Sequence, residues 1–322
     1  MGRVVALLAA VLALAASGCG EDGAEPGVSQ EATLVLDFTP NAVHSGIYAA
    51  LAEGDYADAG IELEVREPGA STDAPKLLEA RRTDFAIMDI NDLGIARTRG
   101  LDVVAIAPIA RLPLAAVIAA DAGLVRRPAD LAGRTVGVTG LPSDDAVLDA
   151  VVAGDGGDPA EVDRVNIGFD AVAALSAGRV DAATAFWNAE GVQLRELGLD
   201  TREFRVSDYV RAAYPELVLV AARETLRSEP ALASGMEQAT SEGYSRVARS
   251  PNVGLEALLE QVPGLEREAV APQLEALIEA RAFALEPGPF RGLEAWADFA
   301  AEGGIVEPAE ARETVRDGFV VP

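Results

Sequence analysis

The sequence of 322 residues contains a single cysteine and a single histidine. One cysteine leaves no intramolecular disulfide and no cysteine-based zinc site, and one histidine, His44, excludes any site that needs two imidazoles. Basic residues are also scarce, because 26 Lys and Arg stand against 52 Asp and Glu, which gives a net charge of −26. No basic run is long enough to neutralise a phosphate backbone, so nucleic-acid binding is not expected.

Long hydrophobic runs are missing too, with one short exception near the N-terminus. Residues 4–16 (VVALLAAVLALAA) are 13 consecutive apolar residues, whereas a helix that spans a bilayer needs about 20. This length, after the basic Arg3, is typical of the apolar part of a secretory signal. Small residues then lead to Cys19, which resembles the bacterial lipobox, where the cysteine thiol accepts a diacylglycerol. A plain secretory cleavage site beside an incidental cysteine is the alternative.

The segment after the cysteine is polar and acidic. Residues 20–31 (GEDGAEPGVSQE) have no apolar period, which is typical of a flexible tether. We therefore expect residues 1–18 to be a lipoprotein signal peptide, residues 19–31 to be a tether, and the folded body to begin at residue 32. This assignment predicts an extracytoplasmic protein that lipid on Cys19 holds at the bacterial cell membrane.

Short β-rich runs alternate with amphipathic stretches in the body. Residues 33–38 (TLVLDF) are typical of a strand, residues 45–59 carry apolar residues at helical spacing, and residues 61–65 are again strand-like. The alternation continues to residue 109 and starts again near residue 128. It predicts mostly parallel sheets with helices on both faces. After residue 222 the pattern is almost entirely helical.

Two apolar runs interrupt the alternation, at residues 114–119 (LAAVIA) and 217–222 (LVLVAA). We interpret both as segments that cross between two lobes, because no helix fits between residue 109 and the first run. The predicted fold class is α/β, with two lobes, a cleft between them and a hinge made by the two crossovers. Lobe 1 would comprise residues 32–115 and a mostly helical return, residues 219–322; lobe 2 would comprise residues 116–218.

This architecture and several short motifs resemble the type II periplasmic binding proteins, the ligand-capturing components of ABC importers. Residues 36–48 (LDFTPNAVHSGIY) are similar to the first-strand motif of the thiamine-pyrimidine branch, in which Pro-Asn, His, Gly and an aromatic follow an aromatic strand end. Weaker matches follow in order at residues 53–56, 82–87, 130–137, 178–182 and 187–191. The resemblance implies that the protein captures a small nitrogen-bearing heterocycle and delivers it to a membrane permease.

The first-strand motif supplies three candidate ligand-binding residues. In open α/β sheets, ligands bind beyond the carboxyl ends of the strands, and Phe38, Asn41 and His44 follow the first strand. Pro40 fixes the chain before Asn41 and aims the loop. His44 either donates to a ligand or, as the alternative, caps the following helix or satisfies a buried carbonyl.

Asp89 is a fourth candidate, because it follows a strand at residues 84–88 that we expect to be central. Its carboxylate suits a ligand amine or a ring amino group. The alternative is that Asp89 is solvated, while Asn91 or Asp92 caps the next helix.

Residues 186–190 (FWNAE) end a strand with two aromatics and a carboxylate, in a chain that is only 5% aromatic. A flat heterocycle that carries nitrogen would stack on Trp187, and Glu190 would accept its N–H bonds. The resemblance adds Asn188 to this group. The alternative is that Trp187 packs under the late helices.

An enzyme of the same fold must also be considered. A yeast-type synthase that resembles these proteins makes the thiamine pyrimidine from pyridoxal phosphate and its own histidine, and it carries a lysine, a histidine and a Cys-rich iron-binding run. The positions that match the lysine and the histidine hold Met88 and Asp92, and the only cysteine lies in the signal region, so neither a Schiff-base nucleophile nor an iron site is placed. We therefore predict a monomeric binding protein without metal or cofactor; binders of sulfonate, nitrate or riboflavin are the alternatives.

Overall fold

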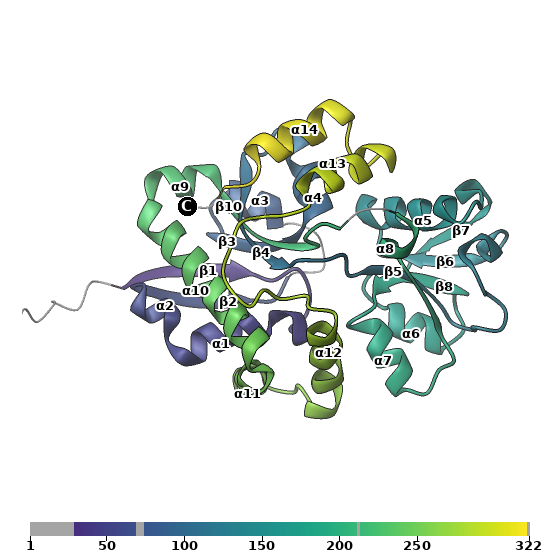
Figure 1. Ribbon diagram of the computed structural model, residues 1–322, viewed down its shortest axis with the longest axis horizontal. Helices are drawn as coiled ribbons and strands as arrows, with labels where there is room; N and C mark the ends of the chain where they lie inside the picture. Colours follow the sequence, from purple (N-terminus) through teal and green to yellow (C-terminus); the bar gives the residue numbers. More distant parts are fainter. Residues whose placement is uncertain (1–28, 69–73, 211–212, 321–322) are drawn as a thin grey trace, which may run out of the picture.

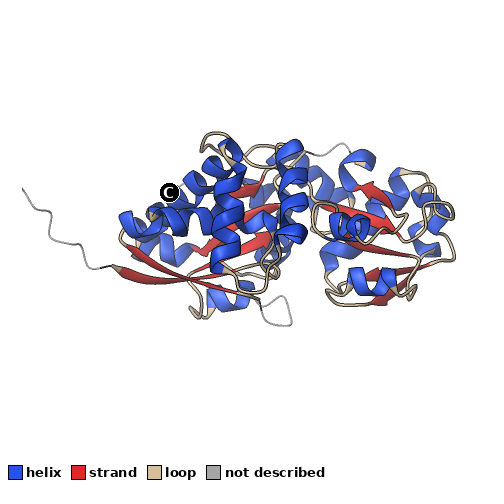
Figure 2. Ribbon diagram, turned by 90° about the horizontal axis from the view of Figure 1, so that it is seen from below, coloured by secondary structure: helices blue, strands red, loops and turns tan. Residues whose placement is uncertain are grey.

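The computed structural model describes residues 29–68, 74–210 and 213–320. Two lobes lie side by side along the longest axis, and each has a sheet covered by helices (Figure 1, Figure 2). The predicted two-lobed α/β fold is therefore confirmed. Cys19 and the predicted signal peptide lie outside the described residues.

The sheet of lobe 1 has five strands in the order β2-β1-β3-β10-β4. β1 pairs in parallel with β2 and with β3, while β10 runs antiparallel between β3 and β4. Lobe 1 is therefore built from two separate parts of the chain. The strands are β1 (Gln30–Val35), β2 (Ile61–Arg66), β3 (Phe85–Asp89), β4 (Val103–Ala110) and β10 (Leu217–Ala222).

The sheet of lobe 2 repeats this arrangement, with the order β7-β6-β8-β5-β9. β6 pairs in parallel with β7 and β8, and β5 runs antiparallel between β8 and β9. All its strands come from one continuous stretch of the chain. They are β5 (Ala115–Ala119), β6 (Thr135–Val138), β7 (Asp163–Asn166), β8 (Ala182–Phe186) and β9 (Arg202–Arg205).

Helices cover both faces of each sheet (Figure 1). One side of lobe 1 carries α1 (Ser45–Glu53), α2 (Asp55–Asp58), α10 (Pro230–Arg249), α11 (Pro251–Gln261) and α12 (Arg267–Glu279). The other carries α3 (Ala74–Glu79), α4 (Ile90–Thr98), α13 (Leu293–Glu302) and α14 (Pro308–Asp317), and α9 (Arg223–Ser228) follows β10. Lobe 2 has α5 (Pro142–Gly154) and α8 (Val206–Tyr209) opposite α6 (Ala171–Ser176) and α7 (Glu190–Glu196).

Within residues 29–68, 74–210 and 213–320, short 3-10 turns complete the elements at Ala42–His44, Pro128–Leu131 and Pro159–Glu161. Among the described residues, no helix combines the length and the apolar character that crossing a membrane requires.

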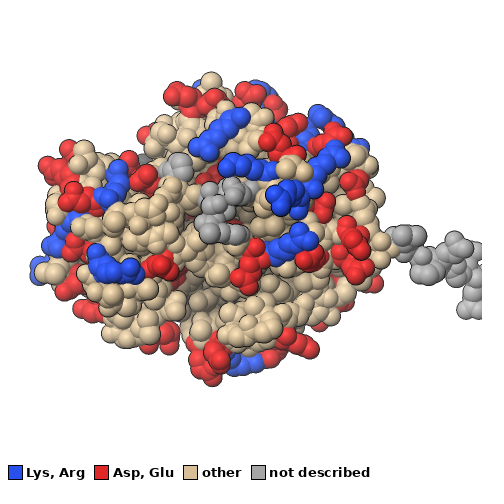
Figure 3. All heavy atoms as spheres, turned by 180° about the vertical axis from the view of Figure 1, so that it is seen from behind, with Lys and Arg blue, Asp and Glu red and all other residues tan. Residues whose placement is uncertain are grey.

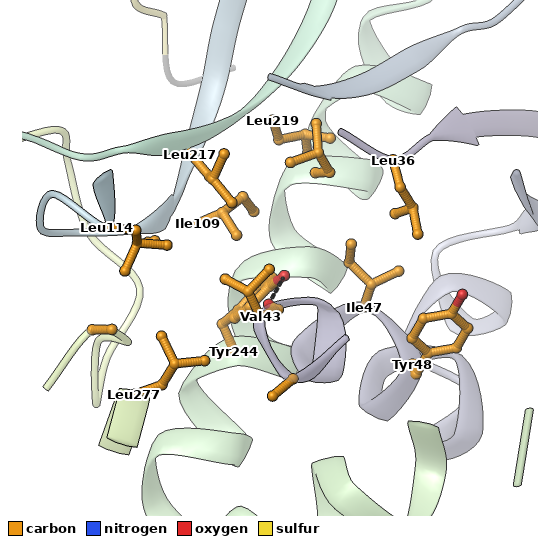
Figure 4. Packing of buried hydrophobic residues seen from close by; sticks show 14 of the residues in the cluster. Leu36, Val43, Ile47, Tyr48, Ile109, Leu114, Leu217, Leu219, Tyr244 and Leu277 are labelled. Atoms are coloured by element: carbon orange, nitrogen blue, oxygen red, sulfur yellow. Dashed lines mark hydrogen bonds between the residues drawn. The ribbon is translucent and has the colours of Figure 1, made fainter. Parts of the chain in front are cut away.

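The core of lobe 1 forms where α1 and α10 meet the sheet (Figure 4). The two helices approach closely because both carry glycine at the contact: a Cβ on Gly243 would lie 2.2 Å from the carbonyl oxygen of Gly46. Beside this contact, the Tyr244 hydroxyl donates to the carbonyl of Val43 at 2.8 Å. Leu36 and Leu217 extend the same core toward the ends of β1 and β10 (Figure 4).

The structure corrects three local expectations. The runs at 114–119 and 217–222 are not the crossing segments: almost all of each is a buried strand, β5 or β10, because the neighbouring strands satisfy its backbone. The chain crosses just before each strand, at residues 111–114 and, in the described part of the second crossing, at residues 213–216. The helix predicted at 45–59 breaks at Gly54, which has a left-handed φ of 82°. The sheets are mixed, because β5 and β10 return antiparallel.

Candidate functional site

A cavity of about 470 Å³ lies between the lobes, where strands of both sheets end. Lobe 1 contributes residues beyond β1 and β3, and lobe 2 contributes residues beyond β6 and β8. This is the place where ligands bind in open α/β sheets. Its polar and aromatic lining includes Asp37, Phe38, Asn41, Asp89, Asp92, Thr139, Asp144, Phe169, Thr184 and Glu190.

Carboxyl groups dominate the charged lining of this cavity. Five of them face it, from Asp37, Asp89, Asp92, Asp144 and Glu190, whereas the basic side chains in the lining are Lys76 and Arg99. Outside the cavity, the face seen in Figure 3 mixes acidic and basic side chains. The cavity is therefore a local concentration of hydrogen-bond acceptors between two lobes.

Asp89 caps the helix that starts at the cavity. Its Oδ1 accepts a hydrogen bond of 2.6 Å from the amide of Asn91, so Asp89, rather than Asn91 or Asp92, is the N-cap of α4. Capping and lining the cavity are compatible because the second carboxyl oxygen is not needed for the cap. Burial, and next the neighbouring Glu216, raise the pKa of Asp89 well above its usual range.

Asp92 on α4 and Asp144 on α5 face each other from different lobes. Burial, and then the charge of Asp144, raise the pKa of Asp92 to about 7, although a hydrogen bond with Ser143 lowers it. Asp144 Oδ2 accepts from the Thr139 amide at 2.8 Å and from the hydroxyls of Thr139 and Thr184 at 2.5 and 3.1 Å. Burial also raises the pKa of Asp144.

Glu190 is the first residue of α7 and lines the lobe 2 side of the cavity. Its Oε2 accepts from the amide of Phe186 at 3.1 Å, which fixes the direction of the carboxyl group. Burial raises the pKa of Glu190. The backbone therefore holds one carboxyl oxygen of Glu190, and the accessible part of this side chain borders the cavity.

Two of the aromatic residues that line the cavity form an edge-to-face pair from different lobes. Phe38, which follows β1, and Phe169, which precedes α6, have ring centroids 5.0 Å apart and an interplanar angle of 84°. Phe169 is 39% exposed. This contact joins the two lobes at the edge of the cavity.

Trp187 does not line the cavity, which corrects the expectation that it stacks on a ligand. The indole is 2% exposed and its Nε1 donates to the carbonyl of Pro113 at 3.1 Å. The guanidinium carbon of Arg205 lies 4.1 Å from the ring centroid. A buried indole needs a partner for its N–H, and here the chain that crosses between the lobes provides it.

His44 and Asn188 also lie outside the cavity lining. The fully buried His44 accepts from the Asn41 amide through Nδ1 at 3.1 Å, so its Nε2 donates to Asp37 Oδ1 at 2.9 Å. His44 therefore makes no side-chain cap of the following helix α1; it closes a capping box with Asn41 on the 3-10 turn Ala42–His44, and it orients a cavity carboxylate. Asn188 is fully buried, and neither polar atom of its side chain has a partner among the described residues.

Four predicted residues do line the cavity: Phe38, Asn41, Asp89 and Glu190. Their contact with a ligand stays a prediction. Asn41 Oδ1 also accepts from the amide of Val43 at 3.0 Å, so its side chain shapes the loop as well.

The sequence interpretation missed Asp37, Asp144 and Phe169. A lone aromatic in the polar loop Gly168-Phe169-Asp170, directly after a predicted strand, was a usable signal for Phe169. Asp144 gave no such signal, because an acid in the first turn of a helix is common for electrostatic reasons. In the part of the chain that the structure describes, no group of three or more His, Cys, Asp or Glu side chains is arranged to hold a metal ion.

Comparison with known proteins adds three findings. A family profile described as NMT1/THI5 like matches residues 41–253, a range that contains most of the cavity lining. The formylaminopyrimidine-binding protein of Halalkalibacterium halodurans is 29% identical over 303 residues, which cover 91% of this chain and 89% of that protein. The 4-amino-5-hydroxymethyl-2-methylpyrimidine phosphate synthase of Legionella pneumophila is 24% identical over 236 residues, 72% of this chain and 74% of that enzyme.

Among solved structures, the alkanesulfonate-binding protein SsuA of Xanthomonas axonopodis pv. citri superposes with a TM-score of 0.66 at 15% identity. The match covers 87% of this chain and 97% of that protein. At this level of identity, the likeness establishes the shared two-lobed fold.

Proposed function

Because the chain belongs to the NMT1/THI5-like family, we propose that it is an extracytoplasmic solute-binding protein of an ABC importer. It captures a small nitrogen-bearing heterocycle, such as a thiamine pyrimidine precursor, between its lobes and delivers it to a permease in the membrane. The observation that carries this proposal is the acceptor-rich cavity, in which carboxyl groups from both lobes surround one space beside an aromatic pair.

A carboxyl group whose pKa lies near neutral pH, as that of Asp92 does, suits an aminopyrimidine. Burial raises the pKa of Asp89, Asp92, Asp144 and Glu190, and that of Asp92 reaches about 7. A carboxyl that keeps its proton offers one donor and one acceptor, and a carboxylate offers acceptors alone. An amino group beside a ring nitrogen presents the complementary pair. The formylaminopyrimidine named for the relative from Halalkalibacterium halodurans has this chemistry.

An anionic solute fits this cavity poorly. Sulfonate or nitrate would meet five carboxyl groups and two basic side chains, Lys76 and Arg99, and a buried charge is costly unless it is paired. The sulfonate-binding neighbour therefore supports the fold and not the ligand.

A binding role is also favoured over synthesis of the pyrimidine. The relative from Legionella pneumophila is a synthase, and the resemblance places a lysine and a histidine of that kind of enzyme at Met88 and Asp92. Met88 is 3% exposed, packs in the core and borders the cavity with a thioether in place of an amine. Asp92 lines the cavity as an acid.

Calorimetry with 4-amino-5-hydroxymethyl-2-methylpyrimidine tests the proposal directly. We expect saturable 1:1 binding in the micromolar range or tighter, about −8 kcal/mol or more favourable, and no measurable heat with methanesulfonate under the same conditions. Riboflavin serves as a larger aromatic comparison. Preference for methanesulfonate, or no binding of any pyrimidine, would refute the assignment of the ligand class.

Attachment to the membrane through Cys19 is part of the same proposal, and it rests on the small residues before that cysteine. A captured solute stays near the permease when the binding protein is tethered to the same membrane. We expect metabolic labelling with a radioactive fatty acid to mark the parent and not Cys19→Ala. Equal labelling of both proteins would exclude the lipid anchor at this position.

A further inference from the structure

Residues 111–114, which we call the first crossing, are tied by one buried carboxylate to residues 213–216, the described part of the second crossing. Glu216 lies just before β10 and is fully buried. Its Oε2 accepts from the amides of Leu114 and Ala115 at 2.6 and 3.2 Å, and its backbone carbonyl accepts from the amide of Ile90 at 2.9 Å. Since burying a carboxylate is costly without such partners, Glu216 makes a specific connection between both crossings and the start of α4.

The first crossing is held from lobe 2 by Trp187. The backbone amide of Trp187 donates to the carbonyl of Leu114 at 3.0 Å, and its indole Nε1 donates to the carbonyl of Pro113 at 3.1 Å. The indole leaves this position only if both its buried N–H and the Pro113 carbonyl lose their partners. The first crossing is therefore held between Glu216 on one side and Trp187 on the other.

Each of these two residues is next to a carboxyl group of the cavity. Asp89 pairs with Leu217 across the sheet, beside Glu216, and the amide of Ile90, the residue after Asp89, donates to the Glu216 carbonyl. Glu190 follows Trp187 by three residues and is fixed by the amide of Phe186, the residue before that tryptophan. The two cavity acids come from different lobes, and each borders a residue that holds the first crossing.

From this juxtaposition, we propose that Glu216 and Trp187 are positioning residues that form a hinge clamp on the first crossing and couple ligand contact at Asp89 and Glu190 to closure of the lobes. The inference rests on the proposed binding function and adds the route by which occupancy reaches the hinge. Neither residue touches the cavity.

The coupling follows from how hinges work. Closure around a ligand concentrates the change of backbone angles in a few residues that link rigid bodies, and a ligand favours the closed state only by the contacts it makes there. A ligand held by Asp89 and Glu190 draws the start of α4 toward the β8–α7 corner. The start of α4 is linked to the first crossing through Glu216, and the β8–α7 corner is linked to it through Trp187. The backbone geometry of the first crossing therefore changes when the lobes close.

Trp187 gives the clamp a built-in optical signal, because the chain has two tryptophans, Trp187 and Trp296. In the Trp296→Phe protein, fluorescence comes from the clamp alone. We expect saturating 4-amino-5-hydroxymethyl-2-methylpyrimidine to shift its emission, although Trp187 does not touch the cavity. In Trp187→Phe, which leaves only Trp296, we expect little change on ligand addition.

Affinity provides the second measurement. Trp187→Phe keeps an aromatic ring and removes the N–H that bonds to Pro113, so we expect the dissociation constant to rise roughly 2- to 12-fold, the worth of one hydrogen bond. Trp296→Phe removes the equivalent N–H bond to Asn91 and is the matched control, with an expected change below twofold.

Hydrogen exchange tests the Glu216 side without any ligand. Glu216→Leu removes the acceptor of two amides, so exchange at Leu114 and Ala115 should become at least about tenfold faster. Glu224→Gln, an exposed glutamate of α9, is the control and should leave both rates unchanged. If Glu216→Leu does not fold, the fluorescence and affinity of the Trp187 and Trp296 variants decide the proposal.

The outcomes separate the clamp from the binding function. Pyrimidine binding by the parent without any change in Trp187 emission, or equal affinity of Trp187→Phe and parent, would overturn the clamp while the proposed function stands. Unaltered exchange at Leu114 and Ala115 in a folded Glu216→Leu protein would overturn it as well. Failure of the parent to bind any pyrimidine in calorimetry would overturn the proposed function and the coupling together.

Discussion

Replacing Glu190 by glutamine is expected to weaken pyrimidine binding about 10- to 150-fold, which corresponds to about 1.5–3 kcal/mol for a hydrogen bond to a charged group. A hydrogen bond from the backbone explains why the substitution lowers the affinity. Oε2 of Glu190 already accepts from the amide of Phe186, so the glutamine carbonyl must remain there. Its NH₂ group would then face the ligand where the parent presents an acceptor, and two donors would meet.

Calorimetry of Glu190→Gln beside Glu196→Gln measures this effect. Glu196 is the last residue of the same helix α7 and is exposed, so its substitution removes the same charge from the same element without touching the cavity. We expect Glu196→Gln to bind like the parent. If Glu190→Gln also binds like the parent, the ligand does not contact this side of the cavity.

Replacing Asp92 by asparagine is expected to raise the free energy of unfolding at pH 8 and to leave it almost unchanged near pH 4. The folded-state pKa of Asp92 is about 7, above the value of about 3.9 for an exposed aspartate. The folded protein therefore holds this proton more tightly than the unfolded chain. Stability from this group is fully present below about pH 4 and is lost as the pH rises toward 7.

The loss at pH 8 is on the order of a few kcal/mol, because each pKa unit is worth about 1.4 kcal/mol. Asparagine carries no charge at any of these pH values, and its carbonyl can still accept from Ser143, so the variant avoids the loss. Burial also raises the pKa of Asp144, which faces Asp92, so Asp144 lowers the free energy of unfolding at high pH in both proteins.

Urea unfolding at pH 4, 6 and 8 measures the difference between Asp92→Asn and the parent. Asp298→Asn serves as the control, because Asp298 is an exposed residue of α13. We expect the Asp92→Asn and parent curves to diverge as the pH rises, and Asp298→Asn to follow the parent. Parallel curves for Asp92→Asn and parent would mean that Asp92 titrates normally in the folded protein.

The fold was predictable because alternating strand and helix patterns depend on local sequence. The site was predictable where a residue lies at a strand end or a few residues beyond it, as with Asp89, which ends β3, and Glu190, four residues after β8. Trp187 also follows a strand, yet its place was decided by Pro113, 74 positions away in the sequence. Phe169 is in the cavity because its loop lies opposite Phe38 of the other lobe. No local pattern encodes either of these long-range contacts.

The crossing runs illustrate the same limit. A stretch such as 217–222 (LVLVAA) is apolar enough for a buried strand, and the sequence alone does not state which sheet receives it. Its antiparallel position between β3 and β4 follows from pairing with residues more than 100 positions earlier in the chain. The sequence therefore predicts that the chain changes lobes, and the strand neighbours determine where.

The place of β10 also governs the order in which the lobes can be completed during synthesis and export. All strands of lobe 2 lie between Ala115 and Arg205, so that lobe has its full sheet once this stretch is available. In lobe 1, β3 and β4 do not pair with each other and are joined only through β10. An emerging chain therefore carries β4 as an unpaired, aggregation-prone edge until residue 222 has followed it. Lobe 2, although second in the sequence, is the first that can close its sheet.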